Sequence, residues 1–212
     1  MTELENQLTK LGYSYKLVGK DIILVENFLP DSFLSEVKNI IDGASQEDWE
    51  KHYMMGVADL AQRKYGRRDV ENLLEEGLIE ITNHWHDKNI GLSHKITGNI
   101  TEKIQDIFDY SDNLKFDGVG TLQRQYEGAE LTEHVDNHAD PKIAYAVIMY
   151  INDDYSEGEL FFNRLSLELK PPAKSMLIFP SGENYLHGVR PPGPGAIRYV
   201  LPSFVRTTNK LY

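Results

Sequence analysis

Cysteine is absent from this chain of 212 residues. Disulfide bonds and thiolate metal sites are therefore excluded, and the absence fits a reducing compartment. Basic residues are also scarce, because 22 Lys and Arg stand against 33 Asp and Glu, which gives a formal net charge of −11. Since nucleic-acid binding relies on Lys and Arg to neutralise phosphates, this charge argues against DNA or RNA as a partner.

Long apolar runs are missing as well. No window of the sequence approaches the length that is needed to cross a bilayer. The polar start, MTELENQLTKLGYSYKLVGK, lacks the apolar segment that signal peptides contain. These absences predict a soluble, intracellular (cytoplasmic) protein without a membrane partner.

The composition that is present is typical of a globular protein. Hydrophobic residues make up 41% and charged residues 26% of the chain, and 212 residues are enough to bury a substantial core. No internal repeat, low-complexity tract or linker is visible. We therefore expect one domain over residues 1–212.

Helical patterns dominate the N-terminal half. Residues 22–25 predict a strand, and the Pro30–Asp31 pair predicts the start of an amphipathic helix that ends at Gly43. The buried stripe of this helix is expected to contain Phe33, Val37, Ile40 and Ile41. The pattern stays helical but less regular from about 47 to 90, and a further helix is expected at about 97–109.

After Asp112 the pattern changes to short runs rich in β-branched and aromatic residues, separated by Gly, Pro and Asn-Asp turns. The runs are LKFDGVGTLQRQY, IAYAVIMYI, GELFF, LSLELK, SMLIFP and IRYVLPSFV. Short strands at this spacing indicate a barrel or jelly roll. We therefore predict an α+β fold with a double-stranded β-helix core (jelly-roll or cupin-like) at about 114–206. An N-terminal strand and helices at about 1–112 would pack against it.

The stretch LTEHVDNHAD at residues 131–140 concentrates candidate metal ligands. In a strand, residues two apart face the same side, so His134 and Asp136 would point together into the barrel while Val135 faces away. His187 follows the apolar strand SMLIFP, and two histidines with one carboxylate form the facial triad of non-haem Fe(II) oxygenases. The pattern therefore favours a metal site.

Two other arrangements of this stretch are possible. His134 and His138 are four apart, as in the His-Glu-x-x-His motif of zinc hydrolases, but Val135 stands where that motif needs its Glu. Asp140 and Pro141 also suit a helix interior poorly. The other arrangement is a polar loop without function. We expect His52, His84, His86 and His94 to be surface or hydrogen-bonded residues. His138 is expected in a solvated loop, and the alternative is a position next to the metal ligands or at the rim of the site.

Arg198 is eleven residues after His187, in HGVRPPGPGAIRYVL. Residues 196–201 predict a strand, and PPGPG would be the turn that brings it back beside the strand of His187. A guanidinium there would clamp a carboxylate with two parallel hydrogen bonds, whereas the alternative is a surface or salt-bridged arginine. Arg190 lies at the turn and is expected to face solvent.

The segments QRQYEGAELTEHVDNH, MYINDDYSEGELFF, LIFPSGENYLHGV and GAIRYVL resemble, in this order, the catalytic core of prolyl 4-hydroxylase-like 2-oxoglutarate- and Fe(II)-dependent oxygenases. The resemblance covers roughly residues 114–206, and NFLPDSFLSEV looks like the helix entry of these enzymes. Glu157 departs from the pattern by replacing the first glycine of a Gly-Gly pair, and Ile151 replaces a leucine. Pro202 would interrupt the last strand, which implies an edge or a bulge there.

Carried over position by position, the resemblance implies three Fe(II) ligands, which are His134, Asp136 and His187. It implies that Arg198 holds the distal carboxylate of 2-oxoglutarate, and it matches Tyr150 and Tyr126 to tyrosines that hydrogen-bond this cosubstrate.

The implied reaction is the O2-dependent hydroxylation of an unactivated C–H bond, with decarboxylation of 2-oxoglutarate to succinate and CO2 and with ascorbate admitted as a reductant. The favoured substrate is a prolyl residue in a peptide or protein. A free amino acid or another small molecule is the alternative.

Two other functions are compatible with the same fold and are less consistent with the sequence. Nucleobase demethylation uses the same triad but needs a second arginine at a fixed spacing, and here the next arginine is Arg206, eight positions on, in an acidic chain. A non-catalytic jelly-roll binding module would usually have lost a metal ligand, and none is lost.

Overall fold

A computed structural model describes residues 1–52, 72, 75–76, 87–138 and 140–208. Its strands in these residues are β1 (Tyr15–Gly19), β2 (Ile22–Val25), β3 (Glu50–His52), β4 (Asp87–Ile90), β5 (Leu114–Phe116), β6 (Leu122–Tyr126), β7 (Leu131–His134), β8 (Ile143–Tyr150), β9 (Leu160–Phe162), β10 (Leu167–Leu169), β11 (Met176–Pro180), β12 (His187–Val189) and β13 (Ile197–Thr207). The helices are α1 (Glu3–Lys10), α2 (Asp31–Gly43) and α5 (His94–Phe108), and short 3-10 turns are η1 (Gln46–Asp48), η2 (Asp136–His138), η3 (Asn163–Leu165) and η4 (Glu183–Tyr185).

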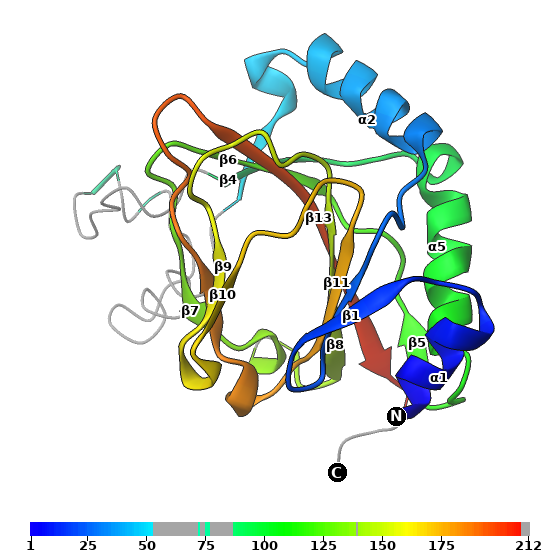
Figure 1. Ribbon diagram of the computed structural model, residues 1–212. Helices are drawn as coiled ribbons and strands as arrows, with labels where there is room; N and C mark the ends of the chain where they lie inside the picture. Colours follow the sequence, from blue (N-terminus) through cyan, green and yellow to red (C-terminus); the bar gives the residue numbers. More distant parts are fainter. Residues whose placement is uncertain (53–71, 73–74, 77–86, 139, 209–212) are drawn as a thin grey trace.

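Two antiparallel sheets face each other across an interior (Figure 1). The larger sheet has the order β1-β2-β11-β8-β13-β6-β4-β3, and β5 pairs with the far end of β13. The smaller sheet has the order β10-β9-β12-β7. This arrangement is the jelly-roll double-stranded β-helix that the short C-terminal strands predicted, with the helices contributed by the N-terminal half.

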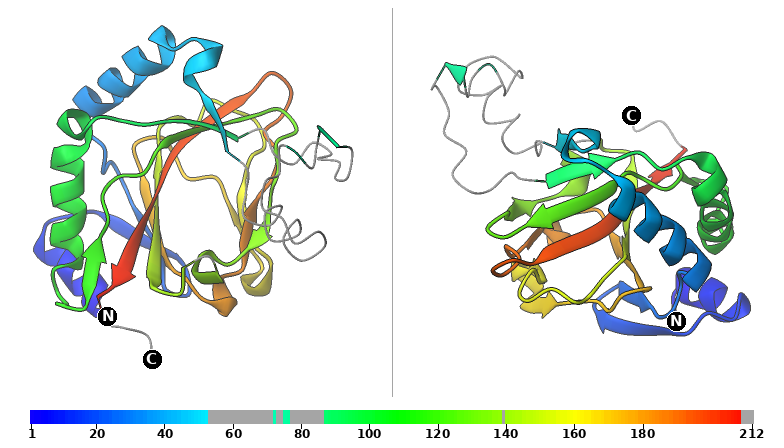
Figure 2. Two further views of the ribbon diagram at one scale, coloured as in Figure 1. Left: turned by 180° about the vertical axis from the view of Figure 1, so that it is seen from behind. Right: turned by 90° about the horizontal axis from the view of Figure 1, so that it is seen from above.

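The described helices lie on the outer side of the larger sheet, as the views from behind and above show (Figure 2). Each is amphipathic and turns one apolar stripe toward that sheet. Helix α1 begins with a capping box, in which Thr2 Oγ1 accepts from the Glu5 amide at 3.2 Å and the Thr2 amide donates to Glu5 Oε2 at 2.6 Å. The helices bury, among others, Leu4, Leu8, Phe33, Val37, Ile100, Ile104 and Phe108.

The larger sheet is buried on both faces, which explains why its central strands are uninterrupted apolar runs. In β8, Val147 and Met149 enter the core that the sheet shares with the helices. Ala146 and Tyr150 instead enter the core between the two sheets. Because strand residues alternate between faces, β2 and β11 divide their side chains in the same way.

Pro202 lies within β13 and does not interrupt it. On one side β13 pairs with β8 through Pro202, opposite Ile148. On the other side β6 pairs only as far as Val200 and β5 only from Val205. The Pro202 carbonyl faces Gly120 on this second side, where any Cβ on Gly120 would lie 2.0 Å from it. The missing N–H of proline therefore costs no ladder hydrogen bond.

Several local expectations can be compared with the structure. The strand at 22–25 and the helix from Asp31 to Gly43 are confirmed, although Ile40 and Ile41 are only half-buried. The helix expected at 97–109 runs from His94 to Phe108.

Other local features differ from the expectations. Helix α1 and strand β1 were not predicted. At Pro202 the expected edge is present on the side of β6 and β5, whereas the register shift of β13 lies between Val205 and Arg206. Residues 50–52 and 87–90 are strands rather than helix, because β3 pairs with β4 and β4 pairs with β6. Most of the helical pattern expected between 47 and 90 lies outside the described residues. No helix in the described part of the chain is long and apolar enough to cross a membrane.

Candidate functional site

Three side chains meet at one end of the interior between the sheets. Strand β7 ends at His134, η2 begins at Asp136, and β12 begins at His187. Since β7 and β12 are antiparallel neighbours with His134 directly opposite His187, the two imidazoles lie side by side, with ring centroids 4.4 Å apart. One candidate ligand atom from each of the three residues lies within 4.8 Å of the others.

Both histidines are oriented by backbone carbonyls. Nδ1 of His134 lies 2.9 Å from the carbonyl oxygen of Thr132, and Nδ1 of His187 lies 2.9 Å from that of Tyr185. Because a carbonyl only accepts, each Nδ1 carries a proton, and in the neutral form of each imidazole the Nε2 has a lone pair for a metal ion. The two Nε2 atoms face Asp136, at 3.5 Å from its Oδ1 for His134 and 3.8 Å from its Oδ2 for His187.

His187 is buried and the other two residues are half-buried, and the protonation of the cluster reflects one carboxylate shared by two imidazoles. Burial lowers the pKa of His187 to about 4, although the charge of Asp136 opposes this. Burial also disfavours protonated His134, but the hydrogen bond and charge of Asp136 outweigh it and raise the pKa of His134. Burial acts to raise the pKa of Asp136, but the hydrogen bond from His134 and both imidazoles hold it below its ordinary value. An ionised carboxylate beside a neutral His187 is a donor set suited to metal binding.

The backbone that brings His134 and Asp136 together differs from the strand that the sequence predicted. The strand ends at His134, and Asp136 opens a 3-10 turn, so the two side chains converge through a turn and not through strand alternation. Val135 is buried, at 3% exposure. The turn is fastened by the Asn137 amide, which donates to the Ser181 carbonyl at 2.7 Å.

The other histidines are placed as follows. His138 is exposed and its Nε2 contacts Glu183 Oε1, so it lies outside the cluster, and the helical His134–His138 zinc arrangement is wrong. His94 is exposed at the start of α5. His84 and His86 lie outside the described residues.

Arg198 lies on β13, and its side chain points into the same interior. The residue is 3% exposed, Nη1 donates to Gln125 Oε1, and Cζ lies 5.4 Å from the ring centroid of Tyr150. Arg198 Nε and the hydroxyls of Tyr150 and Tyr155 are buried without a hydrogen-bond partner among the described residues. Burial raises the pKa of Tyr150 to about 12, so its phenol stays protonated and able to donate. These donors form a pocket suited to an anion.

One detail of the expected pocket is corrected, and the structure adds the surroundings of Tyr126. Strand β13 belongs to the larger sheet and pairs with β8, β6 and β5, so it does not return beside β12. Tyr126 contacts Arg124, whose Cζ lies 4.8 Å from its ring centroid. Because Gln125 pairs with Arg198 and faces the interior, its neighbour Tyr126 is on the opposite face of β6. Gln125 and Tyr155 are the pocket residues that the sequence did not reveal.

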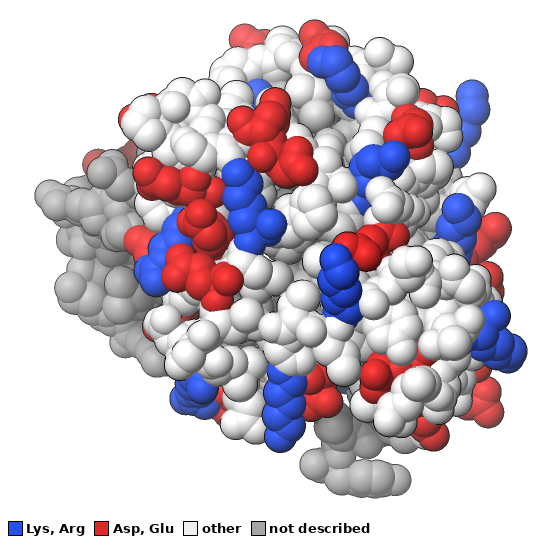
Figure 3. Space-filling model, in the orientation of Figure 1, with Lys and Arg blue, Asp and Glu red and all other residues white. Residues whose placement is uncertain are grey.

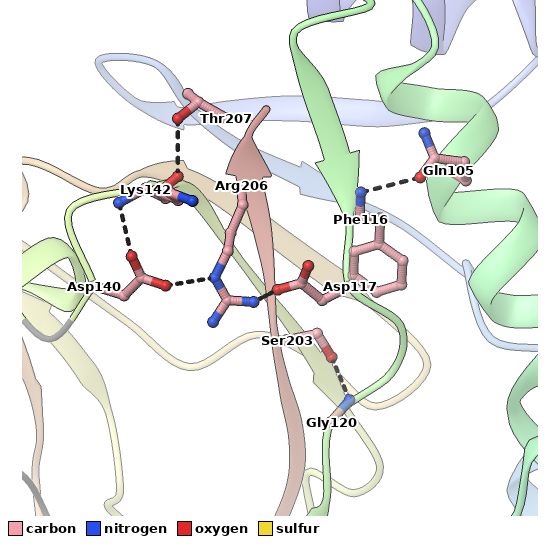
Figure 4. Close-up of polar contacts among 9 residues, drawn as sticks. All are labelled: Gln105, Phe116, Asp117, Gly120, Asp140, Lys142, Ser203, Arg206 and Thr207. Atoms are coloured by element: carbon pink, nitrogen blue, oxygen red, sulfur yellow. Dashed lines mark hydrogen bonds and ion pairs between the residues drawn. The ribbon is translucent and has the colours of Figure 1, made fainter. Parts of the chain in front are cut away.

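The two remaining arginines near this strand have partners. Arg190 is half-exposed, with Nε 3.1 Å from Glu168 Oε1 and Cζ 4.1 Å from the centroid of Phe161. Arg206 pairs with Asp117 and, at 2.8 Å, with Asp140, and thereby joins the loop after η2 to the segment after β5 (Figure 4). Neither guanidinium is available to the pocket of Arg198.

The residues fit an iron ion and a dicarboxylate. Asp136 Oδ2 is buried without a hydrogen-bond partner among the described residues, which is costly for an ionised oxygen unless a cation lies beside it. Donor atoms that share one ion through bonds of about 2 Å lie at most about 4 Å apart. The separations of 3.5 and 3.8 Å between Asp136 and the two imidazoles meet this limit, and the three candidate ligand atoms, all within 4.8 Å of one another, need only small side-chain shifts to surround one ion. Two histidines and one carboxylate with open positions are the ligand set of non-haem Fe(II) oxygenases.

A jelly-roll interior that holds a His-Asp-His cluster and a buried arginine defines the class of a 2-oxoglutarate- and Fe(II)-dependent oxygenase. Residues 121–206 match the family model of the 2OG-Fe(II) oxygenase superfamily. This part of the chain is therefore similar to that superfamily, and the match and the His-Asp-His cluster support Fe(II) and 2-oxoglutarate as cofactor and cosubstrate. A search of curated protein sequences gives no match.

Solved structures share the fold at low sequence identity. The viral collagen prolyl hydroxylase of Paramecium bursaria Chlorella virus-1, in complex with 2-oxoglutarate, is 16% identical with a TM-score of 0.59, over 90% of this chain and 98% of that one. A Trichoplax adhaerens prolyl hydroxylase in complex with a peptide of hypoxia inducible factor is 15% identical with a TM-score of 0.63, over 96% and 87%. A Burkholderia pseudomallei 2OG-Fe(II) oxygenase is 12% identical with a TM-score of 0.58, over 96% and 89%. At these identities the likeness concerns the fold, which is that of prolyl 4-hydroxylase-like oxygenases.

Proposed function

We propose that this protein hydroxylates a prolyl residue in a peptide or protein. Fe(II) would be held by His134, Asp136 and His187, and 2-oxoglutarate would be anchored through its distal carboxylate by Arg198 and Tyr150. The observation that carries the proposal is one buried interior that contains both a metal-ligand cluster and an arginine without a carboxylate partner among the described residues. Tyr126, which faces Arg124, is not part of the proposal.

When bound, Fe(II) and 2-oxoglutarate supply an O2-dependent oxidation that yields succinate and CO2 and adds one oxygen atom to a C–H bond. The chain contributes orientation. The carbonyls of Thr132 and Tyr185 fix the two imidazoles. Phe179 packs edge-on against His187, at a centroid distance of 4.8 Å, and limits its rotation. The Arg198 guanidinium sets the direction in which a dicarboxylate lies, and the apolar walls keep bulk water away.

The prolyl substrate is supported by the fold of the neighbours and by the residues that match the family motif. Two of the similar structures are prolyl hydroxylases by name, and one of them holds a peptide. On the face of the molecule drawn in Figure 3, acidic and basic side chains are intermixed. Together with the net charge of −11, this supports a protein or peptide partner over a nucleic acid.

Two measurements test the proposal. Succinate formation from 2-oxoglutarate with Fe(II) tests the oxygenase without knowledge of the substrate. Mass spectrometry of a library of proline-containing peptides should then show the mass increase of one oxygen atom on proline. Oxidation of free proline or another free amino acid, with no change in any peptide, would instead favour the small-molecule hydroxylase.

The metal ligands have a matched control in the same turn. Asp136→Ala should abolish succinate formation and metal binding, because it removes one of three protein ligands. His138→Ala should leave both near the wild-type level, because His138 contacts Glu183 outside the cluster. Loss of metal binding in His138→Ala with retention in Asp136→Ala would contradict the ligand assignment.

A further inference from the structure

Tyr155 lies in the loop after β8, and no part of the motif that identifies the family assigns it a role. The residue is only 3% exposed, and its hydroxyl oxygen is buried without a hydrogen-bond partner among the described residues. A buried hydroxyl that makes no hydrogen bond is costly, and native structures rarely retain one without a reason.

The loop places the Tyr155 ring against Arg198. Gly158, with φ +74°, lies between the two side chains: a Cβ at Gly158 would be 3.1 Å from Tyr155 Cε2 and 3.6 Å from Arg198 Cδ. The charge of Arg198 acts on the phenol and opposes the effect of burial, which nevertheless raises the pKa of Tyr155. The phenol is therefore a protonated donor next to a buried cation.

Three donors converge on this pocket with nothing in the described part of the chain to accept from them. They are Arg198 Nε and the hydroxyls of Tyr150 and Tyr155. A carboxylate has two oxygens with about four acceptor positions, so it can accept from a guanidinium edge and two phenols together. Gln125 occupies only the Nη1 position of the guanidinium.

We propose that Tyr155 donates a hydrogen bond to the distal carboxylate of 2-oxoglutarate, alongside Tyr150, and is a further cosubstrate-binding residue. The inference rests on the proposed function, since it needs the carboxylate in that pocket. It also bears on Gly158, whose φ of +74° favours glycine: a Cβ there would lie 3.1 Å from the Tyr155 ring, so the ring would have to shift by a few tenths of an ångström.

The test is the affinity of 2-oxoglutarate for the protein loaded with Mn(II), measured by isothermal titration calorimetry without turnover. Tyr155→Phe keeps the ring and its packing, including the contact with Lys170 Nζ at 4.5 Å from the ring centroid, and removes only the hydroxyl. We expect Kd to rise about tenfold or more, because a hydrogen bond to a charged group is lost. The Mn(II) affinity should not change. Tyr13→Phe is the matched control, since Tyr13 packs against Phe28 in the core beside the helices.

A second ligand separates a direct contact from a structural one. The probe 2-oxobutyrate keeps the 2-oxo acid group and lacks the distal carboxylate, so its affinity should be the same for wild type and Tyr155→Phe. Equal weakening for both ligands would assign Tyr155 a structural role and overturn the inference, as would an unchanged Kd for 2-oxoglutarate. If the wild-type protein does not bind 2-oxoglutarate, the proposed function itself fails, and this outcome is distinct from the other two.

Discussion

The two ends of β13 carry arginines in opposite situations. Arg198 is 3% exposed and has only the neutral Gln125 as a hydrogen-bond partner among the described residues. Arg206 has a side chain 34% exposed and is paired with two carboxylates, Asp117 and Asp140. Burying a cation without a counter-charge is costly, so the deeper arginine is the one whose charge the described part of the chain leaves uncompensated.

The difference shows that the charge of one arginine is neutralised within the protein, whereas the charge of the other is not. Arg206 joins three segments of the chain, and its charge is neutralised by the protein (Figure 4). Arg198 is held in place by a neutral amide that orients the guanidinium and leaves its charge for a ligand. Under the proposed function, the same residue type on the same strand thus serves stability at one end and ligand binding at the other.

The largest effect is expected when Arg198 is removed. Arg198→Ala should weaken 2-oxoglutarate binding roughly tenfold to a few hundredfold, because charge-assisted hydrogen bonds of about 1.5–3 kcal/mol or more are lost. Arg198→Lys should lie between, since it keeps the charge without the planar fork. Titration calorimetry with Mn(II) measures both, and the Mn(II) affinity should stay nearly intact. If Arg206→Ala weakens 2-oxoglutarate binding as much as Arg198→Ala does, the contrast between the two arginines is wrong.

A smaller effect is expected when Arg198 is given a carboxylate of its own. Gln125→Glu would make this end of β13 similar to the Arg206 end, because a side-chain carboxylate would take the guanidinium that Gln125 now contacts. We expect 2-oxoglutarate to bind about tenfold more weakly, since the ligand must displace an internal ion pair. Gln125→Met is the uncharged control and should cost less. Normal binding by Gln125→Glu in the same titration would show that the pocket anchors the ligand elsewhere.

Loss of Arg206 should affect stability rather than binding. Arg206→Met leaves Asp117 and Asp140 without their shared cation, and we expect the free energy of unfolding to fall by about 1–2 kcal/mol. Urea denaturation measures this. Lys38→Met, which breaks the exposed Lys38–Asp42 pair, is the matched control and should cost at most about 0.5 kcal/mol. Equal losses in the two variants would mean that the Arg206 network is only a surface ion pair.

The smallest effect is expected at Arg190. Its side chain pairs with Glu168 and covers Phe161 on the outside of the smaller sheet. Arg190→Ala should therefore change the 2-oxoglutarate Kd by less than about twofold, which is within the spread of surface substitutions. The same calorimetric titration decides the point, and strong weakening here with a silent Arg198→Ala would reverse the assignment of the two arginines.

The sequence indicated which residues form the candidate site better than it indicated how the backbone places them. Residue types and spacing pointed to His134, Asp136, His187 and Arg198 as candidates, because ligand chemistry restricts those types, and the family resemblance implied their roles. The turn at Asp136 was not predicted, because the residues His134 to Asp136 are compatible both with a strand that ends at His134 and with a strand that continues. Gln125 and Tyr155 were missed because their roles depend on strand register and on a loop path, and neither is encoded in local periodicity.

The fold shows the same division. Strong periodicity and turn residues predicted β2, α2 and the C-terminal strands. Helix α1 was missed although Thr2 and Glu5 form a capping signature and Leu4 and Leu8 have helical spacing. Strand β13 pairs with strands of the larger sheet and not with β12. This pairing depends on tertiary packing, that is, on which faces of the strands are buried, and local sequence patterns do not specify it.

The alternation of β8 between two cores has a consequence for engineering. Positions 146, 148 and 150 border the interior between the sheets, whereas 145, 147 and 149 border the helices. Substituting the even-numbered positions would reshape the cavity in which cosubstrate and substrate meet, while the odd-numbered ones would anchor the scaffold. A combinatorial library at positions 146 and 148 should therefore change the interior between the sheets while leaving Tyr150, the proposed cosubstrate anchor, and the core beside the helices unchanged.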